Sequence, residues 1–161
     1  MEHAHVIRTF AYVAEDDGSF HVVMEALPRD LFSEIQALQR RVAAGECDEA
    51  ARMAFIGRAF AQIVSAVAYM HSERRVAHRD LKLENICIDE HGTPKLIDFG
   101  CSTRFAASPS AHVYGVCGSD PYIAPEVFAS AATGAGYDGR AADVWALGII
   151  FLAMVSAHFP W

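Results

Sequence analysis

Three short polar motifs in the middle of the chain constrain its fold more than any other feature. The first, His78–Asn85, reads HRDLKLEN, and the second, Asp98–Gly100, reads DFG and begins thirteen residues after Asn85. The third, Ala124–Glu126, reads APE. Each motif alone is weak. All three in this order, with apolar strand-like stretches around the second, leave little room for coincidence.

The composition fits one globular domain. The 161 residues are 53% hydrophobic and carry a net charge of −7, which excludes a wholly disordered chain and gives no support to nucleic-acid binding. The first residues lack the basic and apolar regions of a signal peptide, and the most apolar run, Val144–Val155, is too short to span a bilayer. We therefore expect a cytoplasmic protein with no membrane span and no nucleic-acid partner.

The cysteines are scattered. Cys47, Cys87, Cys101 and Cys117 form no C-x-x-C pair, so the sequence favours neither a zinc site nor a disulfide framework. Free thiols are expected instead. A metal or redox protein built on the cysteines and histidines has no ligand spacing behind it.

Apolar patterning predicts a small hairpin followed by a mostly helical body. In the long central helix the apolar residues recur close to every 3.6 positions, which predicts one buried face. Aspartates precede both early helices as N-caps. The expected elements are hairpin strands Val6–Val13 and Phe20–Glu25, a helix capped by Asp30 through Gln39, a helix from Asp48 to about His71, strands Ile86–Ile88 and Lys95–Ile97, loops at 101–120 and 130–140, and a buried helix from Asp143 onward.

The three motifs are the signature set of the protein kinase domain, and the chain resembles that family over essentially its whole length. The resemblance implies an α+β, protein-kinase-like fold, of which the chain covers a part. Residues 1–24 correspond to N-lobe strands, 25–29 to the hinge and 30–161 to a partial C-lobe. The wording HRDLKLEN, PKLIDFG, VYGVCGSDPYIAPEV and HFPW is similar to the fungal halotolerance and nutrient-permease-regulating Ser/Thr kinases.

The resemblance implies transfer of phosphate from ATP·Mg²⁺ to a protein Ser/Thr hydroxyl. Asp80 would orient that hydroxyl and accept its proton, and Lys82 would neutralise charge on the moving phosphate. Asn85 and Asp98 would hold Mg²⁺, and Ser119 would bond Asp80 and Lys82. Lys82 also points to the Ser/Thr class. The structural alternatives are a helix or turn cap for Asp80 and a turn residue for Asn85.

The resemblance also implies a nucleotide site. Met24 would be the gatekeeper, and the backbone of Glu25 and Leu27 would contact adenine. Asp30 would reach the ribose, although a plain helix cap explains it nearly as well. Cys87 would lie under the adenine ring, where a small apolar residue is typical.

Two further residues are expected to control the loops around Asp80. Asp143 would bond the backbone of His78–Asn85, the segment that carries Asp80 and is called the catalytic loop below. This is a structural role. Arg79 is typical of kinases whose 101–120 loop is ordered by phosphorylation through an upstream kinase. Ser108 and Ser110 are candidate sites, with ordinary loop serines as the alternative.

Some kinase features have no counterpart in the sequence. Gly134–Gly139 literally fits G-x-G-x-x-G, but it follows the APE motif with no preceding strand, so we expect a flexible loop there. The glycine-rich phosphate loop, the lysine of V-A-I-K and the last C-lobe helices are not found. We therefore expect the 161 residues alone to bind ATP weakly. The alternative of a non-catalytic, pseudokinase-like binding or regulatory module stays open.

Overall fold

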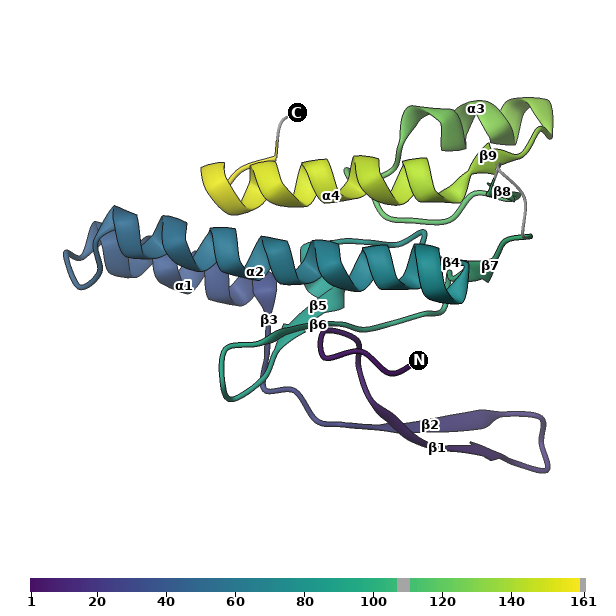
Figure 1. Ribbon diagram of the computed structural model, residues 1–161, viewed down its shortest axis with the longest axis horizontal. Coiled ribbons are helices and arrows are strands. Elements are labelled where there is room, and N and C mark those ends of the chain that lie inside the picture. The colour runs from purple at the N-terminus through teal and green to yellow at the C-terminus, as the bar shows by residue number, and fades with distance from the viewer. Residues whose placement is uncertain (107–110, 160–161) are drawn as a thin grey trace.

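A long helix runs through the middle of the molecule and organises the fold (Figure 1). In the computed structural model, which describes residues 1–106 and 111–159, helix α2 is Glu49–Tyr69 and continues into a π-helical turn, Met70–Arg74. The Asp48 side chain accepts the N–H of Ala51, which confirms the predicted N-cap. The predicted end near His71 lies inside the π-helical turn.

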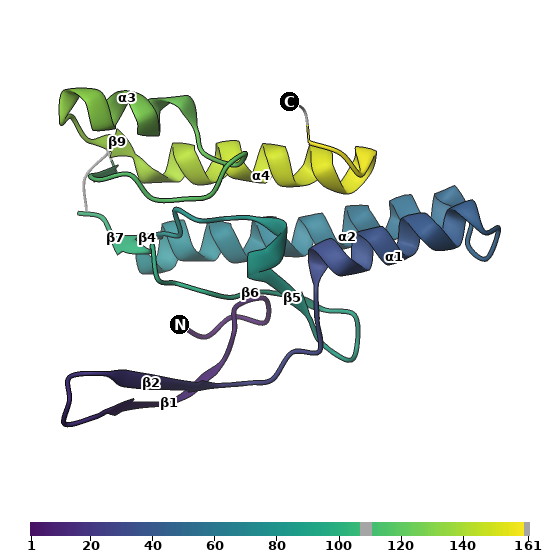
Figure 2. The same ribbon diagram turned by 180° about the vertical axis from the view of Figure 1, so that it is seen from behind.

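The other helices surround α2 on two sides. Helix α1, Leu31–Ala43, lies beside it, and helices α3, Pro125–Thr133, and α4, Gly139–Ser156, lie above it in Figure 1. The strands are β1 Thr9–Ala14, β2 Phe20–Met24, β3 Arg29–Asp30, β4 Val76–Ala77, β5 Ile86–Ile88, β6 Pro94–Leu96, β7 Thr103–Arg104, β8 His112–Val113 and β9 Tyr137–Asp138. The β1–β2 hairpin and the β3–β5–β6 sheet lie on the side of α2 away from α4, as the view from behind in Figure 2 also shows, whereas β8 and β9 lie beside α3 and the start of α4.

Two sheets carry the nucleotide-site candidates. Strands β3, β5 and β6 form an antiparallel sheet in that order, and β1 and β2 form a separate antiparallel hairpin. A parallel bridge between Val6 and Leu96 joins the two sheets, with the N–H of Ile7 donating to the Leu96 carbonyl at 2.9 Å. The predicted hairpin is confirmed, although β1 begins at Thr9 because Val6 and Ile7 pair with β6 instead.

The main hydrophobic core lies between α2, α4 and the β5–β6 strands. The expected periodicity of α2 places one face in this core, and Ala59 and Ala66 lie on that face as well. Val64, which fits the apolar period, is instead 39% exposed. The fully buried side chains of the main core include Leu31, Ile56, Ile63, Met70, Leu81, Leu83, Ile86, Leu96, Ile150 and Met154.

The structure corrects the prediction for the stretch before Asp143. Helix α4 begins four residues earlier, at Gly139, because the Asp138 side chain caps it by accepting the N–H of Arg140 at 2.9 Å. Helix α3 extends into the predicted 130–140 loop and ends at Gly134, whose φ of 69° is the left-handed value that glycine favours. In the G-x-G-x-x-G stretch the expected loop is therefore limited to residues 134–136, and strand β9 and the first residue of α4 follow it.

Two helical spans, Glu49–Arg74 and Gly139–Ser156, are long and apolar enough to cross a membrane by length and composition. Core helices of water-soluble proteins meet the same criterion. Both spans contribute to the main core, and each buries a bonded polar side chain, Arg52 in the first and Asp143 in the second. These features indicate core helices, although α4 is longer than the twelve-residue apolar run suggested.

Candidate active site

The Asp80 carboxylate lies at the centre of a bonded cluster. Its Oδ1 accepts the Ser119 hydroxyl at 2.9 Å, and its Oδ2 accepts Lys82 Nζ at 2.9 Å and Asn85 Nδ2 at 3.1 Å. Lys82 Nζ also donates to Ser119 Oγ at 2.8 Å. The four side chains predicted to act together are thus in contact, and the catalytic loop is joined to the end of the 101–120 loop.

Asp143 holds the backbone on which Asp80 stands. Its Oδ2 accepts the N–H of His78 and its Oδ1 accepts the N–H of Arg79, both at 2.8 Å. Oδ2 also contacts Nε2 of His71 at 2.8 Å. The Asp143 side chain is 1% exposed, so these contacts replace its hydration shell. The expected structural contact is present, and His71 is a partner that sequence reasoning missed.

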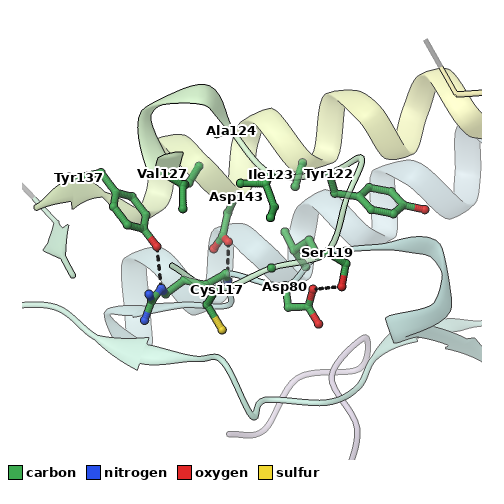
Figure 3. A pocket seen from close by; sticks show the side chains of 14 residues that line it. Asp80, Cys117, Ser119, Tyr122, Ile123, Ala124, Val127, Tyr137 and Asp143 are labelled. Carbon is green, nitrogen blue, oxygen red and sulfur yellow. Dashed lines mark hydrogen bonds between the residues drawn. The ribbon is translucent and has the colours of Figure 1, made fainter. Parts of the chain in front are cut away.

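Asp80, Ser119 and Asp143 lie around one small cavity (Figure 3). The cavity is about 20 Å³, which is room for about one water molecule. It lies behind the catalytic loop, between that loop and the helices α3 and α4. A nucleotide therefore does not fit in it.

His78 is a buried, neutral side chain that holds the catalytic loop in place. It is fully buried, and this burial lowers its pKa, although the Asp143 charge and the hydrogen bond to the Ile97 carbonyl act in the opposite direction. Nε2 lies 3.1 Å from the Ile97 carbonyl, and the N–H of Asp80 donates to Nδ1 at 3.4 Å. A neutral ring protonated at Nε2 satisfies both contacts. The loop carrying Asp80 is thereby fixed to the strand end that precedes Asp98.

Asn85 and Asp98 stand at neighbouring strand ends. The Asn85 carbonyl accepts the N–H of Ile97 at 2.9 Å, which fastens the residue before Asp98 to the metal-ligand candidate. Asp98 has a φ of 56°, and Arg79 has a φ of 69°; such left-handed conformations are uncommon outside glycine and cluster at functional sites. Asp98 is exposed, and its Oδ1 accepts the N–H of Gly100 at 3.1 Å.

The donor chemistry of this pair fits Mg²⁺. Proteins usually hold Mg²⁺ through one or two carboxylates together with substrate phosphates, and not through a complete protein cage. Among the described residues, no group of three or more His, Cys, Asp or Glu side chains is arranged to hold a metal. In the expected metal role, Asn85 and Asp98 would supply only part of the ligand set.

Two of the nucleotide-site candidates, Asp30 and Cys87, lie side by side in the β3–β5–β6 sheet. Asp30 pairs with Cys87 across β3 and β5, and Cys87 pairs with Lys95 across β5 and β6. Glu25 Oε2 accepts Lys95 Nζ at 2.6 Å, and Glu25 Oε1 accepts the N–H of Arg8 at 2.8 Å. Burial opposes ionisation of Glu25, but these two bonds outweigh it and leave its pKa lowered. The Glu25–Lys95 pair was not foreseen from the sequence.

The nucleotide-site candidates differ in their burial and in their hydrogen bonds. The Asp30 carboxylate caps α1 by accepting the N–H of Ser33 at 2.7 Å, as the helix-cap interpretation expects. Burial, assisted by the Asp30 charge, raises the pKa of the Cys87 thiol, so this side chain is a neutral, half-buried group. Met24 is exposed at the end of β2, and Leu27 lies half-buried beyond it.

The Arg79 guanidinium binds backbone carbonyls of the 101–120 loop. Its Nη2 donates to the carbonyls of Tyr114 at 2.8 Å and Gly115 at 2.5 Å, and its Nε donates to the Tyr137 hydroxyl at 2.9 Å. The guanidinium thus already has oxygen partners on this loop. The candidate phosphorylation sites Ser108 and Ser110 lie outside the described residues. Tyr137, on β9, is a partner that the sequence did not reveal.

The structure overturns the expectation of four free thiols. Cys101 and Cys117 form a disulfide with Cα atoms 6.1 Å apart, whereas Cys47 and Cys87 are free. Sixteen positions separate the bonded pair, and neither belongs to a recognisable cysteine motif. Only the folding of the 101–120 loop brings them together, so no sequence signal announced the bond.

Comparison with known proteins agrees with this geometry. The model of the protein kinase domain family matches residues 1–161, the whole chain. The chain is 37% identical to the serine/threonine-protein kinase oca2 of Schizosaccharomyces pombe, with 100% of this chain and 23% of the relative covered. It is 38% identical to the nitrogen permease reactivator protein of Saccharomyces cerevisiae, covering 100% of this chain and 19% of that protein.

The similarity extends beyond fungi. The chain is 38% identical to the maternal embryonic leucine zipper kinase of Xenopus laevis, with 99% of this chain and 22% of that kinase covered. The chain therefore spans about a fifth to a quarter of the length of these three relatives.

Proposed function

Because the chain belongs to the protein kinase domain family, we propose that the protein is a serine/threonine kinase that transfers phosphate from ATP to protein hydroxyls. The observation that carries the proposal is the Asp80 carboxylate, which Ser119, Lys82 and Asn85 hold in one orientation. A carboxylate used only as a turn cap needs no lysine beside it. Lys82 at this position supports the Ser/Thr class.

Asp80 and Lys82 divide the chemistry of the transfer. Asp80 orients the attacking hydroxyl and accepts its proton, and Lys82 lies 2.9 Å away, where it offsets the charge that accumulates in the transition state. Ser119 holds both groups in register. Bound ATP·Mg²⁺ supplies the phosphoryl group. Catalysis by this family rests on positioning and charge, which a preorganised cluster of this kind supplies.

Asn85 and Asp98 bind Mg²⁺ in this proposal, and the β3–β5–β6 sheet supports the nucleotide. Cys87 and Leu27 contact the adenine ring, with Met24 as gatekeeper and the Glu25 backbone as a hydrogen-bonding edge. Asp30 reaches the ribose only if its helix-capping bonds to Ser33 rearrange.

The proposal includes the organisation of the domain. Residues 1–24 supply N-lobe strands, residues 25–29 the hinge and residues 30–161 part of the C-lobe. The protein acts in the cytoplasm on a protein substrate, and an upstream kinase acts on the 101–120 loop. These assignments are supported by the order of the elements around Asp80, and by the nature of the relatives.

A transfer assay tests the proposal. The complete protein is incubated with ATP, Mg²⁺ and a generic basic protein substrate, and phosphate incorporation is measured for the wild type and for Asp80→Asn. We expect Asp80→Asn to lower kcat by about 10²–10⁴-fold, because the amide cannot accept the proton. Asp16→Asn, an exposed change in the hairpin turn, serves as the matched control and is expected to keep wild-type activity.

Equal phosphate incorporation by the wild type and Asp80→Asn would reject the assigned role of Asp80. A wild-type protein that binds its partners but transfers no phosphate would favour the non-catalytic, regulatory alternative. Circular dichroism of each variant checks that the mutated proteins are folded.

A further inference from the structure

The 101–120 loop is closed on itself by a covalent bond that the three motifs do not require. Cys101 and Cys117, both half-buried, are bonded, while the remaining cysteines, Cys47 and Cys87, are not. Their Cα separation of 6.1 Å lies within the range that a disulfide spans. Partial exposure leaves the sulfurs within reach of a small thiol.

The two sulfurs lie at functionally distinct places. Cys101 directly follows Gly100 of the DFG motif, next to the proposed metal ligand Asp98. Cys117 precedes Gly118 and Ser119, whose hydroxyl bonds Asp80. The disulfide therefore connects the metal-binding end of the loop to the end that holds the catalytic carboxylate.

Other described parts of the loop, residues 103–104 and 112–115, are attached to the body of the protein by separate contacts. Strand β7 pairs with β4, strand β8 pairs with β9, and Arg79 bonds the carbonyls of Tyr114 and Gly115. Between Gly115 and the helix α3, the described attachments are the Cys117 sulfur, the Ser119 hydroxyl at Asp80 and Lys82, and the buried Tyr122, whose hydroxyl accepts the N–H of Leu83 at 3.4 Å. Loss of the disulfide thus loosens residues 116–118 and leaves Ser119 attached only from the Tyr122 side, while β7, β8 and Tyr122 stay in place.

We propose that Cys101 and Cys117 form a reversible redox pair, whose disulfide holds Ser119 against Asp80 and whose reduction releases it. Disulfides inside cells are typically transient and redox-sensing, and a bond that closes a loop acts by restricting the loop's open conformations. This inference concerns regulation of the proposed kinase site, so its activity component rests on the proposed function. Its structural component does not.

The redox step is a thiol–disulfide exchange with a dithiol reductant. A reductant thiolate attacks one sulfur of the pair, the Cys101–Cys117 bond breaks, and a mixed disulfide forms as one protein thiolate leaves. The second reductant thiol then displaces the other protein sulfur. Two electrons and two protons reach the cysteine pair, and the reductant leaves as its own disulfide. An oxidised dithiol or oxidised glutathione drives the reverse reaction.

Peptide mapping and limited proteolysis test the structural component without any activity. The complete protein is equilibrated with oxidised or reduced dithiothreitol, alkylated and mapped by mass spectrometry. We expect a linked Cys101–Cys117 peptide in the oxidised sample and two alkylated cysteines in the reduced sample. We also expect reduction to speed protease cleavage within residues 111–119 by about tenfold, because the loop opens more often.

Variants separate this pair from the other thiols. Cys101→Ser and Cys117→Ser are each expected to show fast cleavage whether oxidised or reduced. Cys47→Ser, a free cysteine outside the proposed site, is expected to keep the wild-type response to reduction. Absence of the linked peptide in the oxidised sample, or equal cleavage rates for oxidised and reduced wild type, would overturn the proposal.

Phosphate transfer measured on the same samples tests the activity component. We expect reduction to lower the wild-type rate by about tenfold, with the reduced rate matched by both serine variants. A rate that is unchanged or rises on reduction would overturn the activating role of the bond. If no sample transfers phosphate but the linked peptide and the cleavage response are present, the redox pair is supported and the proposed function fails.

Discussion

The histidine before Arg79 and Asp80 illustrates how one residue fixes a catalytic loop without touching substrate. His78 contacts the Ile97 carbonyl through one ring nitrogen and the N–H of Asp80 through the other. The ring also lies against Phe99 of the DFG motif, with centroids 5.1 Å apart. Both nitrogens are used only while the ring is neutral, so protonation removes an acceptor that the loop needs.

This arrangement predicts a loss of stability in mild acid. Burial lowers the pKa of His78, so below pH 6.5 the unfolded chain binds a proton that the folded chain does not. The free energy of unfolding should therefore be level above about pH 7 and fall as the pH drops below 6.5, with a slope of up to about 1.4 kcal/mol per pH unit. Urea unfolding at a series of pH values measures this slope.

His78→Gln should reduce that slope, whatever its effect on the absolute stability. The exposed His112→Gln serves as the control and should keep the wild-type slope. His3, whose pKa is lowered by burial and by the neighbouring His5, supplies a smaller residual slope in both proteins. The role assigned to His78 fails if its variant titrates like the wild type.

For single residues, the sequence predicted the contacts among motif residues. It did not predict contacts that involve residues outside the motifs. The resemblance placed Ser119 beside Asp80 and Lys82 because the family carries a Ser or Thr hydroxyl at that position. The Cys101–Cys117 bond and the contact between His71 and Asp143 join residues 16 and 72 positions apart. Such pairs depend on how separate elements pack, and the identity of one residue does not predict which distant residue it will contact.

The position of helix α4 depends on the glycine at its first residue, Gly139. A Cβ on Gly139 would lie 2.8 Å from the Cβ of Ala77 and 3.2 Å from Cγ2 of Val113. The helix start thus approaches β4 and β8 more closely than any side chain allows. Composition predicted a loop here because glycine disfavours helices, whereas packing requires it at the first helical position.

Two alanine substitutions in α4 are expected to act in opposite directions. Gly139→Ala should destabilise the protein by about 1–3 kcal/mol, because the new methyl group overpacks the contact with Ala77. Gly148→Ala, in the same helix with nothing within 4 Å of its Cβ, should stabilise it by about 0.5–1 kcal/mol. Midpoints of urea unfolding provide the comparison, and equal shifts for the two variants would contradict the close approach.

Elements whose sequence signal lies within a few residues were predicted, and elements that depend on distant partners were not. The caps at Asp30 and Asp48 and the period of α2 depend on near neighbours, and each is confirmed. Strands β7, β8 and β9 have two residues each and exist only because a distant partner pairs with them. No local pattern distinguishes them from loop.

For the molecule as a whole, Asp143 joins parts that are otherwise distant in sequence. It projects from α4 and contacts His71 at the end of α2 together with the backbone of His78 and Arg79. The two core helices and the catalytic loop therefore share one buried carboxylate. Arg52 makes a second such connection, from α2 to the carbonyls of Met154 and Val155.

Removal of this carboxylate should destabilise the entire protein. Asp143→Ala leaves the buried N–H of His78 and the partly buried N–H of Arg79 without an acceptor, and we expect a loss of about 3–5 kcal/mol in the free energy of unfolding. Asp138→Ala, at the N-cap of the same helix, should cost only about 1 kcal/mol. Calorimetry or urea unfolding measures both. A loss for Asp143→Ala no greater than that for Asp138→Ala would mean that water replaces the missing oxygens.

The shared carboxylate has a consequence for genetic screens. In a library of single substitutions scored only by cell growth, variants at Asp143 and at Asp80 would be depleted alike. Both residues would then be interpreted as catalytic. Scored by the amount of protein that accumulates, the two would separate, because Asp80 variants would persist as inert molecules while Asp143 variants would be degraded. The difference between the two scores would distinguish the residue that reacts from the residue that holds the reacting loop in place.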